Sequence, residues 1–265
     1  MLKYKSLLRL FIAIMLLFGG TAGAQLDGLP QKAKDKAGEI FEKKADKKKL
    51  KENRKKGSQA TIAPGYFVQG DSLLFNENFV TFTAGSSVPS FKTNGAAVVA
   101  TVEGQKGKWM VLRDKATFKL SKAIRYPKRF TVEFDILASG DNITDISPLS
   151  FGFATDNSAS EYTSTAGTYV QLHYYDGDQV NVGSNNPQKF ASTTYELSAG
   201  LNRPMHIALA VNGETLTVYL DGNKVADTIL FSPGAAKNFY ITAPWEYKNG
   251  AKVLVSNFKI SAFTN

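Results

Sequence analysis

The chain has 265 residues, of which 43% are hydrophobic and 12% aromatic, enough for one sizeable buried core. It contains no cysteine, which excludes disulfides, thiolate metal sites, a cysteine nucleophile and the lipid-modified cysteine of bacterial lipoproteins. The net charge of +9 comes from the N-terminal part, because residues 57–265 carry 17 basic and 17 acidic side chains, and a nucleic-acid groove on this balanced part is therefore not expected.

The first 24 residues have the pattern of an export signal. Basic residues at positions 3–9 precede the apolar run 10–18, and Ala-Gly-Ala at 22–24 fits the small-residue rule for cleavage before Gln25. The apolar run is shorter than the roughly 20 residues that a spanning helix needs, although an uncleaved N-terminal anchor is an alternative. We therefore expect an exported protein that is periplasmic, extracellular or associated with the outer membrane.

Residues 25–65 are predicted to form a basic arm and linker in front of one domain at 66–265. Residues 32–56 hold 12 basic and 5 acidic side chains, and a thin apolar stripe at helical spacing indicates a partly helical arm. Such an arm serves either as a solvated spacer or as an electrostatic contact to an anionic envelope surface, such as lipid head groups or acidic glycans.

From residue 66 onward, period-two alternation predicts strands. The clearest one before the central hairpins is residues 129–137 (RFTVEFDIL), where apolar side chains occupy one face and Glu133 and Asp135 occupy the other. The closing strand is expected to return beside the first. Further strands are expected within residues 72–82, 96–102, 109–112, 116–120, 150–154, 169–175, 179–182, 195–197, 238–242 and 252–262.

Residues 205–230 predict a three-stranded meander. Its turns are expected at Asn212-Gly213 and Asp221-Gly222, because these dipeptides supply the positive φ angles of two-residue hairpins. The middle strand alternates Leu216, Val218 and Leu220 with polar or mixed neighbours, so one face should cover a core. Around a dozen short strands without a convincing domain helix predict an all-β, two-sheet antiparallel jelly-roll sandwich.

The segment MHIALAVNGETLTVYLDGNKV resembles the laminin-G-like members of the concanavalin A-like jelly rolls. Together with LFNENF, RFTVEFDIL and VLVSNFKI, it resembles a jelly-roll domain of certain bacterial envelope proteins, over residues 73–260. The resemblance implies that fold, an envelope location and a structural role for His206 in its strand. In those proteins a peptidoglycan-binding domain of the outer-membrane-protein-A type often follows; the sequence stops at Asn265, so anchoring through that domain is not implied.

Glu133 and Asp135 are the best enzyme candidates, because carboxylates at i and i+2 of a strand share a face. Glycosidases of this fold use a Glu-x-Asp-x-(x)-Glu run, and here the third carboxylate is missing. We expect a polar sheet face with a basic residue opposite, and no enzyme. A carbohydrate hydrolase is the alternative, and its sign would be a cleft with two facing carboxylates and His173.

Aromatic side chains near loops favour a ligand-binding module, because sugar rings stack on such faces. The candidate ligand-binding residues are Trp245, Glu246, Tyr247, His173, Tyr175 and Trp109. The function expected from them is a non-catalytic module that binds a glycan or a cell-envelope polymer. A scaffolding protein with protein partners is a further alternative, and an exposed sheet edge or apolar patch would be its sign.

Two oxygen-rich loops are candidates for calcium, which prefers oxygen ligands. One contains Asp141, Asn142 and Asp145, and the other contains Asp176 and Asp178. Asp and Asn are also the usual residues of turns. No cofactor is therefore expected, with calcium as the alternative.

Overall fold

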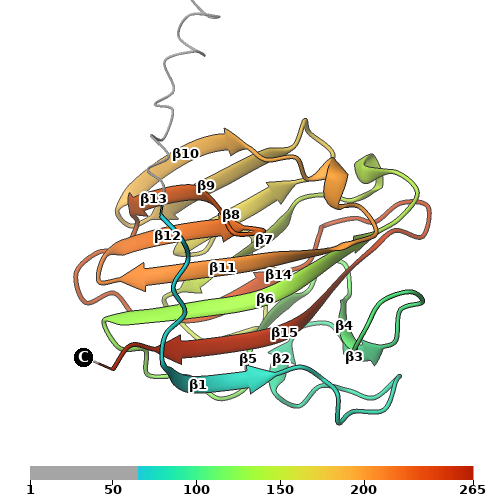
Figure 1. Ribbon diagram of the computed structural model, residues 1–265, viewed down its shortest axis with the longest axis horizontal. Helices are drawn as coiled ribbons and strands as arrows, with labels where there is room; N and C mark the ends of the chain where they lie inside the picture. The colour runs from blue at the N-terminus through green and yellow to red at the C-terminus, as the bar shows by residue number, and fades with distance from the viewer. Residues whose placement is uncertain (1–64, 265) are drawn as a thin grey trace, which may run out of the picture. The chain divides into compact units, whose positions relative to one another are not determined.

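The computed structural model describes residues 65–264, which form two antiparallel sheets packed face to face (Figure 1). The predicted all-β, two-sheet sandwich is confirmed. The only helices among these residues are the short 3-10 helices Ile143–Asp145 and Ser198–Gly200. No helix in this part of the chain is long and apolar enough to cross a membrane. The predicted export signal and basic arm lie outside the described residues.

Sheet A contains the first and the last strand of the domain side by side, as predicted. Its order is β13 (Asn223–Ile229), β12 (Thr215–Leu220), β11 (Pro204–Asn212), β6 (Arg129–Ser139), β15 (Lys252–Ala262), β4 (Trp109–Leu112) and β3 (Ala97–Ala100), with β1 (Ser72–Glu77) also paired to β15.

Sheet B includes two strands that the sequence does not predict, β2 and β10. Its order is β10 (Gln188–Thr194), β9 (Gln179–Asn185), β8 (Thr168–His173), β7 (Leu149–Ala154), β14 (Asn238–Thr242), β5 (Thr117–Leu120) and β2 (Phe91–Thr93). Strand β2 has only three residues, and β10 is an edge strand with no fully buried residue, so neither shows an apolar alternation. Residues 195–197, expected as a strand, follow the end of β10.

The core fills the space between the sheets. Leu216, Val218 and Leu220 are all 0% exposed, which confirms the predicted inward face of β12. At the centre, the ring of Phe134 on β6 stacks on Phe258 of β15, with centroids 5.3 Å apart and an interplanar angle of 13°. Phe134 also contacts aromatic rings of β7 and β14, so both sheets share this core.

The two predicted hairpin turns differ in detail. Leu220 pairs with Asn223 across Asp221 and Gly222, whose φ angles are 47° and 77°, as predicted. The other turn is shifted by one residue: Asn212 pairs with Thr215, so Gly213 and Glu214 form the turn. Asn212 also pairs with Arg129 of β6, and these two pairings hold it in the strand.

Each outer face of the sandwich is crossed by a segment without regular structure. On sheet A, residues 65–71 run toward β1 (Figure 1); the ring of Phe67 lies 5.5 Å from that of Tyr219, and the Gly70 N–H donates to Thr131 Oγ1 at 3.3 Å. On sheet B, residues 155–167 cover outward-facing polar side chains, and the Thr163 N–H donates to Thr117 Oγ1 at 2.8 Å. The part of the outer face of sheet A that is open to solvent lies beside residues 65–71.

Candidate functional site

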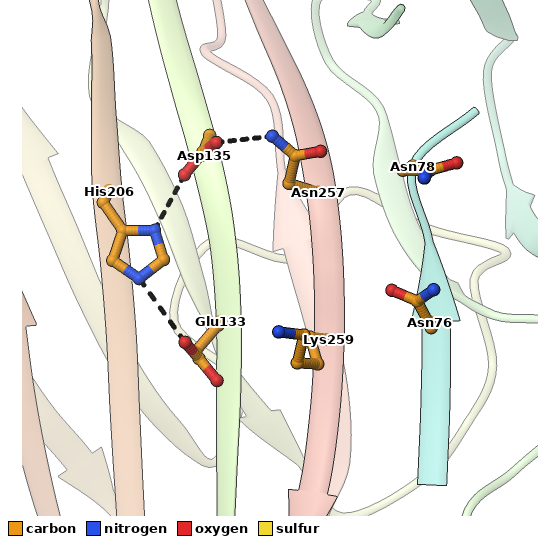
Figure 2. A pocket seen from close by; sticks show the side chains of 7 residues that line it. All are labelled: Asn76, Asn78, Glu133, Asp135, His206, Asn257 and Lys259. Carbon is orange, nitrogen blue, oxygen red and sulfur yellow. Dashed lines mark hydrogen bonds and ion pairs between the residues drawn. The ribbon is translucent and has the colours of Figure 1, made fainter. Parts of the chain in front are cut away.

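A pocket of about 420 Å³ opens on the outer face of sheet A (Figure 2). Every residue that lines it has a polar side chain, and these residues come from strands β11, β6 and β15 and from the end of β1. The lining residues are Asn76, Asn78, Glu133, Asp135, His206, Asn257 and Lys259. Carboxylates, amides, an ammonium group and an imidazole therefore face one volume.

Strands β6 and β11 place the charged centre of the pocket. Phe134 points into the core, so Glu133 and Asp135 on either side of it point outward, as the sequence predicts. The antiparallel register sets His206 directly opposite Asp135. The His206 backbone is fixed by Asp221 of the predicted Asp-Gly turn, whose Oδ1 accepts from the His206 N–H at 2.8 Å.

His206 joins the two carboxylates. Its Nδ1–H donates to Asp135 Oδ1 at 2.8 Å, and its Nε2 lies 3.6 Å from Glu133 Oε2. The hydrogen bond to Asp135, followed by the interaction with Glu133, raises the pKa of His206 to about 9, although partial burial opposes the rise. At neutral pH a protonated imidazole therefore bridges two carboxylates, and the basic residue expected opposite them is this histidine.

A β-bulge in β15 supplies the second hydrogen bond to Asp135. The pairing of β15 with β6 shifts between Ser256 and Lys259, and Asn257 within the bulge has a φ angle of 54°. Bulges redirect side chains, and asparagine tolerates the left-handed region better than most residues. Asn257 Nδ2 donates to Asp135 Oδ2 at 2.7 Å, so both oxygens of this carboxylate are occupied.

Sequence reasoning did not select Asn76, Asn78, Asn257 or Lys259 as site residues. One signal was present: the core positions of the last strand are Val253, Val255, Phe258 and Ile260, and the step of three residues breaks the period of two at Asn257. The residues of β1 carry no such signal, because their place beside the pocket depends on pairing with β15 across the whole domain.

Two of the predicted ligand-binding aromatics are packed into the fold, Trp109 fully and Tyr247 partly. Trp109 is 2% exposed, in a small apolar cluster with Leu137 and Leu254, and its Nε1–H donates to the Lys106 carbonyl oxygen. The expectation that Trp109 presents a face to a ligand is therefore corrected. The Tyr247 hydroxyl donates to the Leu112 carbonyl oxygen at 2.9 Å, which makes this side chain an anchor of its loop.

The other predicted residues lie near one end of sheet B. Trp245 is 55% exposed, and its ring makes a T-shaped contact with that of Tyr162, with the ring centroids 5.2 Å apart. The adjacent Glu246 forms an ion pair with Lys248 at 3.8 Å. At the end of β8, the His173 ring lies 6.1 Å from that of Tyr175.

His173 differs from His206 in its electrostatic setting. Its Nε2 is hydrogen-bonded to the Asn181 amide at 2.9 Å, and partial burial lowers its pKa. His173 belongs to sheet B and does not line the pocket with Glu133 and Asp135. The cleft expected of a hydrolase, with two carboxylates and His173, is therefore not assembled.

The candidate calcium loops do not gather a ligand set. Asp145 is buried, with Oδ1 accepting from Asn249 Nδ2 at 3.1 Å, but Asp141 is exposed. Both oxygens of Asp178 accept hydrogen bonds from Ser198. Within residues 65–264, no group of three or more acidic, histidine or cysteine side chains is arranged so that it could hold a metal ion, whereas calcium requires six or more oxygen ligands. The described residues do not fit a calcium site.

No protein-family model matches this sequence, and no curated protein matches it either. Among solved structures, the carbohydrate recognition domain of Emp47p is 14% identical, with a TM-score of 0.55 over 75% of this chain and 100% of that one. The metal-free exoplasmic/lumenal domain of VIP36 is 12% identical, with a TM-score of 0.52 over 71% of this chain and 91% of that one.

A sialidase also matches over 74% of this chain, but the match spans only 19% of the sialidase, at a TM-score of 0.49. At these identities, the likeness concerns the fold alone. The chain has the concanavalin A-like β-sandwich fold.

Proposed function

We propose that this chain is an exported, non-catalytic β-sandwich module that binds a glycan in the pocket on the outer face of sheet A. The observation that carries the proposal is the polar pocket itself, in which amides, carboxylates and an ammonium group offer donors and acceptors to one ligand. Sugar hydroxyls both donate and accept hydrogen bonds, so a mixed set of this kind suits them.

The solved structures of the same fold support the ligand class. The Emp47p structure is described as a carbohydrate recognition domain, and VIP36 has been solved with Man3GlcNAc and with mannose. These ligands belong to those proteins. They show that the fold presents sugar sites elsewhere, which makes glycans the first class to test here.

The electrostatics of the pocket support binding over catalysis. A general base works best with a pKa near the operating pH, whereas the pKa of His206 is raised to about 9 and its ring is engaged by two carboxylates. The Glu-x-Asp-x-(x)-Glu run of glycosidases with this fold is incomplete here. Ile136, Leu137 and Ala138 follow Asp135, so β6 does not supply the third carboxylate of that run. A hydrolase is therefore the second candidate, and the same experiment tests it.

The test is calorimetric titration of the full chain with a panel of neutral and acidic oligosaccharides. Wild type should bind at least one of them, and Asn76→Ala and Glu133→Gln should each weaken that binding at least fivefold. Asn76 is exposed, so its truncation leaves the core intact. Binding without release of new reducing ends is expected. Release that Glu133→Gln abolishes would replace the binding module by the hydrolase.

A matched control separates the pocket from the aromatic end of sheet B. The chain has only two tryptophans, and Trp109 is buried, so a ligand-induced change in fluorescence reports on Trp245. Trp245→Ala should leave the affinity unchanged if the glycan occupies the pocket. Loss of binding in Trp245→Ala but not in Asn76→Ala would move the site to sheet B, and no binding to any glycan would overturn the proposal.

A further inference from the structure

The groups of the pocket divide into those that are already satisfied and those that are open. Both oxygens of Asp135 accept hydrogen bonds, and both ring nitrogens of His206 face a carboxylate. These groups hold one another in place. A ligand that enters the pocket therefore meets the remaining groups first.

The open groups lie on the β15 and β1 side of the pocket and are mostly donors (Figure 2). The Lys259 ammonium donates to Gln69 Oε1 at 3.5 Å and forms no ion pair within the described residues. Asn78 Oδ1 accepts from the Val80 N–H, and its amide NH2 has no partner among residues 65–264. The Asn76 side chain has no hydrogen bond in this part of the chain and points toward the pocket.

The register brings Lys259 and Asn76 into one row across the sheet. Lys259 pairs with Glu133 on one side and with Asn76 on the other, so its ammonium lies between a carboxylate and an amide. Glu133 is 8% exposed, and its Oε1 is buried without a hydrogen-bond partner among residues 65–264. Because that oxygen is shielded from solvent, a ligand in the pocket meets the Lys259 ammonium and the Asn76 amide instead, and these donors call for a ligand that brings an acceptor.

We propose, on the basis of the proposed function, that the pocket selects acidic sugars: the carboxylate of a uronic acid binds the Lys259 ammonium and the Asn76 amide. A carboxylate matches these donors because charge-assisted hydrogen bonds are about twice as strong as neutral ones. Residues 57–265 have equal numbers of basic and acidic side chains, so the selection must come from this local arrangement rather than from the field of the whole domain.

The experiment compares matched acid and neutral ligands on the full chain. Methyl glucuronide with methyl glucoside, and methyl galacturonide with methyl galactoside, are titrated by ligand-observed NMR against wild type, Lys259→Gln and Lys259→Arg. At least one acid should bind wild type about tenfold more tightly than its neutral partner. Lys259→Gln should weaken binding of the acid far more than binding of its neutral partner and so abolish that preference, and Lys259→Arg should retain part of it.

The control is Lys252→Gln, which removes the same charge from an exposed position of the same strand and should leave the preference intact. All variants keep the basic arm, so a difference between them reports on the pocket. Equal binding of acid and neutral sugars by wild type, or an acid preference that survives Lys259→Gln, overturns this inference but leaves the proposed function in place. If neither kind of sugar binds, and the oligosaccharide panel also fails, both proposals fall.

Discussion

On the outer face of sheet B, Thr117, Thr242 and Lys119 are at most 2% exposed beneath residues 155–167, whereas on sheet A the His206 side chain is 44% exposed at the pocket. Two polar side chains of the covered face are satisfied by the covering segment. Thr242 Oγ1 donates to the Thr163 carbonyl oxygen, and Lys119 Nζ donates to that of Asp156 at 2.9 Å. Backbone carbonyl groups of residues 155–167 thus occupy these polar side chains of sheet B, as a bound ligand would.

On the open face of sheet A, the hydrogen-bonding groups around Asp135 are satisfied, because both of its carboxylate oxygens accept hydrogen bonds. The Asn76 amide and the Lys259 ammonium, which line the pocket beside residues 65–71, remain open to a ligand there. The comparison shows why a polar outer face is not by itself a binding site. Both faces are polar, but on sheet A the Asn76 and Lys259 side chains line a pocket that is open to solvent.

The largest loss of stability is expected from a change in the core that both sheets share. Phe134→Ala should lower the free energy of unfolding by about 3–5 kcal/mol, because it removes a fully buried ring that contacts Phe258, Phe151 and Phe239. Both faces should loosen together, measured by denaturant unfolding and by proteolysis of residues 155–167. Phe190→Ala is the control, because Phe190 is 64% exposed and should change stability by less than about 0.5 kcal/mol. A loss below about 1 kcal/mol for Phe134→Ala would contradict the shared core.

Asp135→Ala should affect sheet A alone. It leaves His206 Nδ1 and Asn257 Nδ2 without their acceptor, and hydrogen bonds to a charged group are worth about 1.5–3 kcal/mol. Chemical denaturation should show a loss of about 2–3 kcal/mol, with unchanged proteolysis of residues 155–167. The matched variant on sheet B is Asp156→Asn, whose side chain is 69% exposed and whose removal should have little effect. A larger loss for Asp156→Asn than for Asp135→Ala would reverse the comparison.

The sequence predicts the sandwich well because burial follows a period of two. The expected bounds of the last strand, 252–262, agree with β15, and the inward faces of β6 and β12 are as predicted. The missed strands β2 and β10 lack the signal for a physical reason: they lie at the two edges of sheet B, where few side chains need to be buried.

The site was only partly predictable. That Glu133 and Asp135 share a face follows from local geometry, but their partner His206 is 71 residues from Asp135 and reaches it only through the pairing of β6 with β11. Such pairings are not visible in one sequence. The aromatic criterion failed for Trp109 because a large ring also fills a gap on an outer face, here beside Leu137 and Leu254.

Thr242→Val tests the covered face in isolation. The Thr242 hydroxyl bonds the Thr163 carbonyl oxygen and lies 3.2 Å from Thr117 Oγ1, so its loss should reduce stability by about 1–2 kcal/mol and speed cleavage of residues 155–167. Affinity for a ligand of the sheet A pocket should not change. Thr163→Val is the control, since the Thr163 hydroxyl bonds only the Glu161 carbonyl oxygen at the surface, at 3.4 Å. Equal cleavage of Thr242→Val and wild type would show that the cover does not depend on this contact.

The smallest effect concerns the charge on His206 and depends on pH. Its pKa is about 9 in the folded protein against an ordinary value of 6.5, so its stabilising contribution is complete below about pH 6.5 and is lost as the pH rises through about 9. Because the side chain is 44% exposed, screening reduces this contribution to about 1 kcal/mol. The stability difference between wild type and His206→Gln should therefore shrink between pH 6 and pH 10.

Only two histidines occur in the chain, and the pKa of His173 is lowered, so proton NMR should show one ring titrating above and one below the ordinary value. Two rings that both titrate near 6.5 would show that the carboxylates do not hold the proton on His206, and the electrostatic argument against a general base would then fail.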